Sequence, residues 1–201
     1  MSQRGAIWWT ALALVAAPFA APVEAAEEYR FKPFIAATWS APMDSTEAIL
    51  GTETAEIELS DEAGWEIGAE WRFGRFLGLE ASYGRSEHEI RFGNAAIGDA
   101  TFEPLYVALD FHVFARAEFD VWVAPTVVFA SWQEENLQRG VEEGDDSDTG
   151  FGVTVGADWL LGETFALTAA VRYVDVQIGL GPKGTIAVDP LTLRVGVAAK
   201  L

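Results

Sequence analysis

The feature that most constrains the fold is an alternation of apolar residues with polar or small ones along most of the chain. In the segment 62–73, one face of an extended chain carries Trp65, Ile67, Ala69, Trp71 and Phe73, and the other carries Glu66, Gly68, Glu70 and Arg72. The segments 150–161 and 189–201 repeat the pattern. Because successive side chains of a β-strand point to opposite faces, a period of two predicts strands.

Segments of this kind predict eight strands, at 29–41, 62–74, 76–92, 101–115, 119–133, 150–161, 164–178 and 189–201. The connections at 74–75, 115–118 and 162–163 are tight, whereas those at 42–61, 93–100, 134–149 and 179–188 are longer. An even number of strands joined alternately by short turns and long loops is typical of outer-membrane barrels. We therefore predict an all-β fold, an eight-stranded antiparallel up-and-down transmembrane barrel with short periplasmic turns and longer extracellular loops.

Apolar residues make up 50% of the chain, yet beyond the N-terminus there is no run of the roughly 20 apolar residues that a membrane helix needs. Inside lipid every backbone polar group must be paired, so a membrane protein without such helices must be a closed barrel. The competing interpretation is a soluble periplasmic barrel, which would place its apolar side chains inside. Trp39 and Trp65 at one end, with Trp71 and Trp159 at the other, resemble two aromatic girdles and favour the membrane.

The first 25 residues have the pattern of an export signal. Arg4 precedes an apolar run at 6–17, Pro18 follows the run, and small residues precede a cleavage site after Ala25. The alternative is an N-terminal anchor helix, but the run is too short to span a bilayer. The predicted domains are a signal peptide at 1–25 and a barrel at 26–201, and the predicted location is the cell outer membrane.

The formal net charge of −18 argues against a nucleic-acid partner, because phosphate binding needs Lys and Arg. Acidic residues concentrate in the loops 42–61 and 134–149. Loose association with divalent cations and a merely solvated, repelling surface are both open there. The segment 145–150 resembles the start of a calcium loop, but Gly156 stands where the bidentate Glu would be. We predict no specific metal site and no cofactor.

Ser86 and His88 share the inward face of one predicted strand and raise the question of catalysis. Residues two apart stand about 6–7 Å apart along a strand, and no Gly-x-Ser-x-Gly elbow accompanies them. We therefore predict no catalytic residues. His112, close to Asp110, is interpreted as a member of an interior polar network.

Inward-facing residues change character along the predicted barrel. Toward the turns they form an interior charge network of Glu70, Arg72, Glu80, Asp110, Asp158, Arg172 and Arg194. Toward the loops they form an apolar lumen of Ile90, Phe102, Tyr106, Val128, Trp132, Val174, Val176 and Ile178. An eight-stranded barrel has room for its own side chains or for one small ligand. The lumen is therefore either a filled core or a pocket whose ligand would leave sideways, where Pro104 and Pro125 remove backbone donors.

With the strands placed, the chain resembles the outer membrane protein W (OmpW) family over nearly its whole mature length. The stretches that carry the resemblance are 78–90, 100–113, 119–132, 150–161, 171–179 and 188–197. The resemblance implies a narrow, mostly apolar interior, a link to uptake of small hydrophobic molecules, and no enzymatic activity. The chain departs from the family at its end, because Ala199-Lys200-Leu201 replaces the usual terminal aromatic residue.

These observations favour a passive carrier or narrow channel for small hydrophobic molecules. One alternative is a structural or adhesive outer-membrane barrel whose acidic loops bind cations. A less favoured alternative is an enzyme that modifies outer-membrane lipid. The partners expected are outer-membrane lipid and lipopolysaccharide, small hydrophobic ligands, and divalent cations held loosely at the acidic loops.

Overall fold

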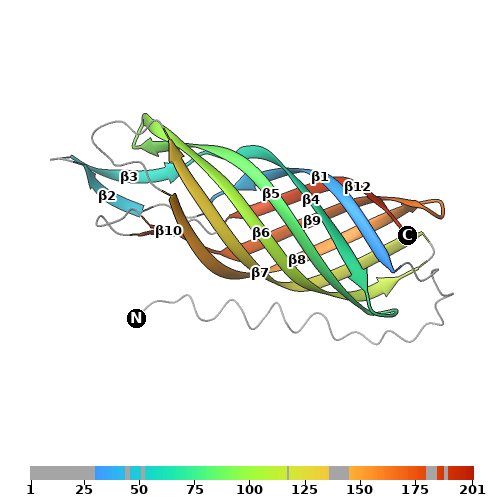
Figure 1. Ribbon diagram of the computed structural model, residues 1–201. Coiled ribbons are helices and arrows are strands. Elements are labelled where there is room, and N and C mark those ends of the chain that lie inside the picture. The colour runs from blue at the N-terminus through green and yellow to red at the C-terminus, as the bar shows by residue number, and fades with distance from the viewer. Residues whose placement is uncertain are drawn as a thin grey trace.

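In the computed structural model, the described residues form eight long antiparallel strands that close into a barrel (Figure 1). The structure describes residues 30–43, 46–50, 53–116, 118–135, 145–179, 185–187 and 190–201. The barrel strands are β1 (Phe31–Ala41), β4 (Glu62–Arg72), β5 (Leu77–Phe92), β6 (Ala95–Ala115), β7 (Phe119–Glu135), β8 (Asp145–Leu161), β9 (Phe165–Asp175) and β12 (Leu191–Ala199). Each pairs with its neighbours in the order β5-β4-β1-β12-β9-β8-β7-β6, and the β5–β6 pairing closes the ring. The predicted fold class is confirmed.

The predicted signal peptide at 1–25 lies outside the described residues. Among the residues that are described, no helix is long and apolar enough to cross a membrane.

The two ends of the barrel differ. At the turn end, short connections join β4 to β5, β6 to β7, and β8 to β9, with Gly74 and Gly162 at positive φ. The first and last strands also meet there, because the backbone amides of Arg30 and Phe31 donate to the carbonyl of Leu201 at 3.0 and 3.1 Å. The opposite end, here called the loop end, carries the other four connections.

The loop end contains more regular structure than the sequence predicted. The long loop expected at 93–100 is wrong, because a turn at Gly93-Asn94 joins β5 directly to β6, and Gly93 has a φ of 59° that suits glycine. The connection 42–61 contains the hairpin β2 (Thr46–Leu50) and β3 (Glu53–Leu59), and β3 extends the sheet beside β5. The connection after β9 contains a small second sheet of β10 (Gln177–Gly179) and β11 (Thr185–Ala187).

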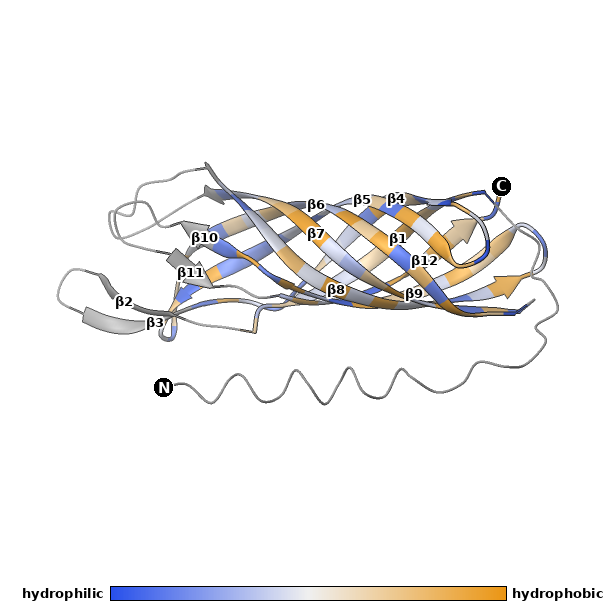
Figure 2. Ribbon diagram, turned by 90° about the horizontal axis from the view of Figure 1, so that it is seen from below, coloured by the Kyte–Doolittle hydropathy of each residue, from blue (hydrophilic) through white to orange (hydrophobic). Residues whose placement is uncertain are grey.

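The two faces of the barrel wall have opposite polarity, as the alternating hydropathy colours along each strand show (Figure 2). Outward-facing Ile35, Ile67 and Val195 are 56%, 52% and 54% exposed. Inward-facing Glu70 and Thr154 are completely buried. This is the distribution of a barrel in lipid and the reverse of that in a water-soluble carrier.

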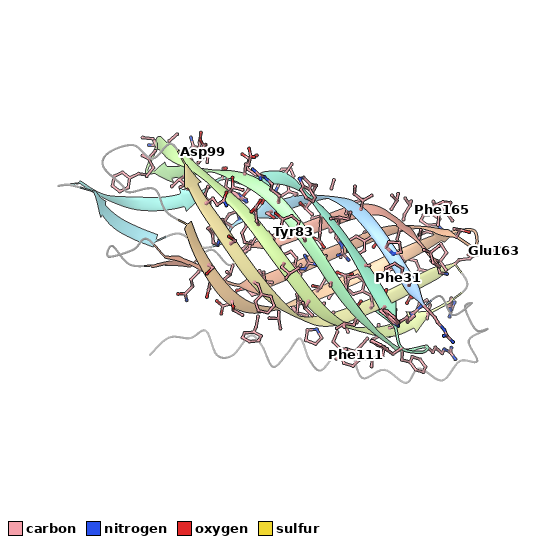
Figure 3. The ribbon with its side chains drawn as sticks, in the orientation of Figure 1. Phe31, Tyr83, Asp99, Phe111, Glu163 and Phe165 are labelled. Atoms are coloured by element: carbon pink, nitrogen blue, oxygen red, sulfur yellow. The ribbon has the colours of Figure 1, made fainter. Side chains whose placement is uncertain are left out.

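Aromatic residues mark both ends of the outer surface. Trp39 and Trp65 lie on β1 and β4 toward the loop end and are exposed, and so are Trp71 and Trp159 toward the turn end. Phe31, Phe111 and Phe165 also point outward near the turn end (Figure 3). Amphipathic or bulky rings at these two heights suit the boundaries between lipid and water.

Candidate functional site

The barrel interior is divided along its axis into three layers. Nearest the turn end is the floor cluster, formed by Lys32, Glu70, Arg72, Asp110, His112, Asp120 and Asp158. Above it is the four-charge cluster, formed by Glu66, Glu80, Arg172 and Arg194. Toward the loop end is the apolar cluster, formed by Ile90, Phe92, Ile97, Ala100, Phe102, Tyr106, Val128, Ala130, Trp132, Val174 and Val176. The layers follow from which inward positions on each strand are charged and which are apolar.

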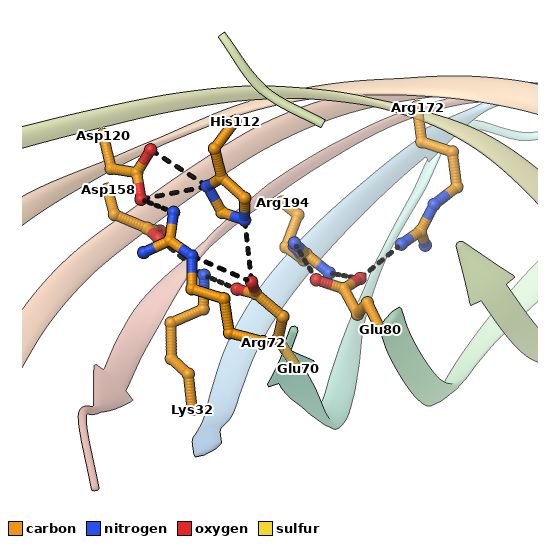
Figure 4. A network of polar contacts seen from close by, with 9 residues as sticks. All are labelled: Lys32, Glu70, Arg72, Glu80, His112, Asp120, Asp158, Arg172 and Arg194. Carbon is orange, nitrogen blue, oxygen red and sulfur yellow. Dashed lines mark hydrogen bonds and ion pairs between the residues drawn. The ribbon is translucent and has the colours of Figure 1, made fainter. Parts of the chain in front are cut away.

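The four-charge cluster is balanced in charge. Arg194 Nη1 lies 2.7 Å from Glu66 Oε1 and 2.7 Å from Glu80 Oε1. Arg172 Nη1 lies 2.9 Å from Glu66 Oε2, and its Nη2 lies 3.5 Å from Glu80 Oε1. Figure 4 shows Glu80 between the two guanidinium groups. Each buried charge therefore has opposite charges within contact distance, which is the condition for burying it.

In the floor cluster, cations from β1 and β4 hold carboxylates from β4, β7 and β8 (Figure 4). Lys32 Nζ lies 2.6 Å from both Glu70 Oε2 and Asp158 Oδ2. Arg72 Nη2 donates to Asp120 Oδ2 at 2.7 Å. Together these contacts block the barrel axis at the turn end.

His112 lies between two carboxylates of the floor cluster. Its Nδ1 is 3.0 Å from both carboxylate oxygens of Asp120, and its Nε2 is 2.8 Å from Glu70 Oε1. Asp110 is two residues away on the same face of β6 and is 1% exposed. Neither of its carboxylate oxygens has a hydrogen-bond partner among the described residues.

Aromatic rings flank the four-charge cluster, with Tyr106 on the side of the apolar cluster and Phe34, which packs with Ala166 and Ala198, on the turn side. The Arg172 guanidinium carbon lies 3.6 Å from the centroid of the Tyr106 ring, and that of Arg194 lies 4.4 Å from the centroid of Phe34. Such contacts stabilise a cation that is shielded from water. Tyr106 therefore belongs to both the charged and the apolar layers.

The apolar cluster is tightly filled. Phe102 and Trp132 stack with their ring centroids 4.2 Å apart, and Val128, Val174 and Val176 are fully buried. The structure thus brings together seven of the eight residues predicted to line the lumen. The side chain of the eighth, Ile178, lies outside the described residues.

The barrel wall is interrupted beside the apolar cluster. The β5–β6 pairing runs to Tyr83↔Leu105 and resumes at Ser86↔Phe102. Pro104 lies in the gap, where its nitrogen cannot donate a hydrogen bond. Pro125 lies in a similar gap, since the β6–β7 pairing runs to Ala108↔Thr126 and resumes at Phe111↔Val123, although its pairing with Val153 on the other side is continuous. This second gap lies beside Asp110 and the charged part of the interior, not beside the apolar cluster.

A small cavity lies at the interruption beside Pro104. Its volume of about 10 Å³ is room for roughly one water molecule. Its lining includes inward-facing Ser86, Phe102 and Tyr106 as well as Trp65 and Arg85, whose side chains are exposed on the outside. The cavity therefore lies within the wall between the lumen and the lipid-facing surface.

Ser86 and His88 are closer than predicted. Ser86 Oγ lies 2.8 Å from His88 Nε2, and His88 Nδ1 lies 2.8 Å from the carbonyl oxygen of Ser60. The expected separation of 6–7 Å is the distance between the backbone positions of the two residues, whereas their side chains bend toward each other. A backbone carbonyl takes the place of the carboxylate that orients the histidine in a Ser-His-Asp triad.

All seven residues of the predicted charge network lie inside the barrel, and six of them make ion pairs. Sequence reasoning did not assign Lys32, Glu66 and Asp120 to that network, although all three fall on inward positions of their strands. Extending this alternation to the strand ends could have found Lys32 and Asp120, whereas Glu66 already stands on the polar face of the segment 62–73.

The sequence profile of a family described as the outer membrane protein beta-barrel domain matches residues 10–200. Among solved structures, the chain is similar to the outer membrane protein OprG from Pseudomonas aeruginosa, with a TM-score of 0.73 and 14% identity, covering 89% of this chain and 99% of that one. It is also similar to the outer membrane protein AlkL, with a TM-score of 0.57 and 17% identity, covering 92% of this chain and 98% of that one. A third similar structure is Ail, the attachment invasion locus protein of Yersinia pestis, with a TM-score of 0.54 and 12% identity, covering 87% of this chain and 99% of that one. No curated protein sequence matches the chain.

Proposed function

Because the chain belongs to the outer membrane protein beta-barrel domain family, we propose that it is a passive, non-enzymatic carrier that passes small hydrophobic molecules from its loop-end lumen into the surrounding lipid. Within this family, the motif stretches between 78 and 197 support placement near the OmpW proteins. The apolar outer surface supports outer-membrane lipid and lipopolysaccharide as its surroundings.

The observation that carries this proposal is the interruption of the β5–β6 ladder beside the apolar cluster. Straight passage along the axis is opposed by two layers of buried charges, which an apolar solute cannot solvate. A sideways route needs a weak point in the wall at the height of the apolar cluster. The gap at Gly84–Arg85 and Glu103–Pro104 lies at that height, next to Phe102.

Binding requires side chains of the lumen to move, because the cavity has room for only about one water molecule. Phe102, which lines the cavity at the gap, stacks on Trp132 of the apolar cluster. An apolar solute would take the place of one of these aromatic side chains and make the same apolar contacts with the rest of the lumen. In the carrier mechanism, the ligand thus displaces side chains that fill the lumen when no ligand is bound.

The packed lumen also favours a second function, a structural or adhesive barrel without transport. In that case the apolar cluster is simply the core, and the acidic loops would meet the partner. One solved structure of the same fold is named for attachment and invasion. The two functions differ in whether the wall must open.

A reversible lock across the wall tests this difference. Arg85 and Glu103 face each other at the gap, with Arg85 Nη1 3.1 Å from Glu103 Oε1, and the chain contains no cysteine. The double variant Arg85→Cys/Glu103→Cys, oxidised to a disulfide, should slow uptake of an apolar dye into vesicles, and a reductant should restore the rate. The matched control is Ala81→Cys/Val107→Cys, a facing pair in the continuous ladder.

The carrier proposal predicts that only the lock at the gap affects uptake. If both locked barrels transport the dye as fast as the reduced ones, the wall does not open there. If in addition apolar ligands leave the fluorescence of Trp132 unchanged at every accessible concentration, the structural function is the better assignment.

A further inference from the structure

The two charged layers of the interior differ in balance. The four-charge cluster has two carboxylates and two guanidinium groups. Within the described interior, the floor cluster has four carboxylates (Glu70, Asp110, Asp120 and Asp158) but only two permanent cations, Lys32 and Arg72. With His112 neutral, the floor cluster is short of two positive charges. An excess of buried negative charge is unfavourable unless something neutralises it.

The excess negative charge of the floor cluster lies at Asp110. Its carboxylate is buried and lacks a hydrogen-bond partner among the described residues. One ligand atom each from Glu70, Asp110 and His112 lies within 4.8 Å of the other two. Ligand atoms on one zinc ion lie about 2.0–2.2 Å from the metal, so small side-chain movements would bring all three into coordination.

His112 is oriented as a metal ligand. Its Nδ1 faces the Asp120 carboxylate at 3.0 Å, while its Nε2 points toward Glu70. A neutral imidazole carries only one N–H, so with that proton on Nδ1 it donates to Asp120 and keeps a lone pair on Nε2. A cation bound there would replace the present 2.8 Å contact between Nε2 and Glu70 Oε1. A carboxylate behind the distal nitrogen of a ligating histidine is the usual outer contact of protein metal sites.

We propose that Glu70, Asp110 and His112 bind one divalent metal ion of the zinc class, with Asp120 as the residue that positions His112. Calcium and magnesium take oxygen ligands, whereas an imidazole nitrogen with carboxylates suits zinc and neighbouring transition metals. The charge of such an ion equals the deficit of the floor cluster. The ion would link β4 to β6 across β5 and brace the turn end of the barrel.

The competing explanation is protonation. A proton on His112 and another on Asp110 would also remove the excess negative charge, without any metal. If a metal ion is bound, the folded barrel retains it and is stabilised by it. If the groups are protonated instead, the barrel retains no metal at this site and zinc does not stabilise it.

The site is enclosed, so the test loads metal during folding. The full mature chain is refolded in detergent with zinc, desalted, and its zinc content measured by atomic emission. We expect about one tightly held zinc per wild-type chain beyond what Asp110→Asn retains. Asp120→Asn should bind zinc about 10–100-fold more weakly, since it weakens the contact that orients His112 while removing no ligand, although it also weakens the ion pair with Arg72. Glu80→Gln is the matched control, because it removes a buried carboxylate at the four-charge cluster without removing a ligand.

Only zinc that depends on the proposed ligands supports the site. Equal zinc retention by wild type and Asp110→Asn would mean that the metal sits elsewhere, such as on the acidic loops, and would overturn the proposal. Should Asp110→Asn fail to fold, the wild type alone decides. Its urea unfolding midpoint should rise in zinc relative to chelator, and magnesium should not reproduce the rise. Identical midpoints in zinc and in chelator would favour protonation.

Discussion

At the scale of single residues, the interior keeps most of its charged side chains by pairing them across the barrel. Arg194 on β12 contacts Glu66 on β4 and Glu80 on β5, which are far from it in sequence. The alternation of the sequence was enough to predict that these residues face inward. It could not predict which charges pair, because the pairs depend on how strands distant in sequence face one another across the lumen. The proximity of Ser86 and His88 was missed for a different reason, the freedom of their side chains.

Removing Arg194 should therefore be costly. We expect Arg194→Ala to lower the free energy of unfolding by about 3–5 kcal/mol, because Glu66 and Glu80 would stay buried with one cation fewer. Urea unfolding of the refolded barrel measures the change. Arg85→Ala is the control, since Arg85 makes its ion pairs with Glu87 and Glu103 on the outer surface and should shift the midpoint little. Equal midpoints for wild type and Arg194→Ala would show that the pairs do not hold the barrel together.

At the scale of the elements, the period of two located all eight barrel strands, but the loop end was less predictable. The Gly93-Asn94 pair is a two-residue hairpin signal that could have shortened the expected loop at 93–100. The hairpin β2–β3 had no such clear signal, because its pairing with β5 depends on the neighbouring strand being in place. Strand ends are thus set by their partners more than by their own sequence.

Two prolines provide a matched test of the wall. Pro104→Ala supplies a backbone donor at the interrupted ladder, so we expect slower amide exchange around Gly84 and Arg85 and slower uptake of an apolar dye. Pro125→Ala makes the same chemical change at the gap in the β6–β7 ladder, which lies beside the charged part of the interior. It should slow amide exchange locally but leave dye uptake unchanged. If the two variants slow dye uptake equally, the interruption at Pro104 is not the weak point of the wall.

At the scale of the whole molecule, the alternation and the family profile together place the barrel in the outer membrane. The export signal stays a prediction. We expect the mature protein to begin at Ala26 and to fractionate with the outer membrane, which N-terminal mass spectrometry and cell fractionation would show. The folded barrel should also migrate differently on gels before and after heating, because a closed hydrogen-bonded ring resists detergent until heated. A soluble product whose migration does not depend on heating would contradict the assignment.

The junction of β1 and β12 at the turn end has a consequence for biosynthesis. These strands are the first and last of the barrel, and their pairing continues to the contact of Arg30 and Phe31 with Leu201. Closing the ring therefore pairs two strands that are separated in sequence by nearly the whole length of the barrel. If the predicted signal directs export, closure waits until the final strand has crossed the inner membrane, and until then the edge of β1 that faces β12 is unpaired. Such a chain needs chaperones that guard exposed edges during transit, and its slowest folding step should be the meeting of its two ends.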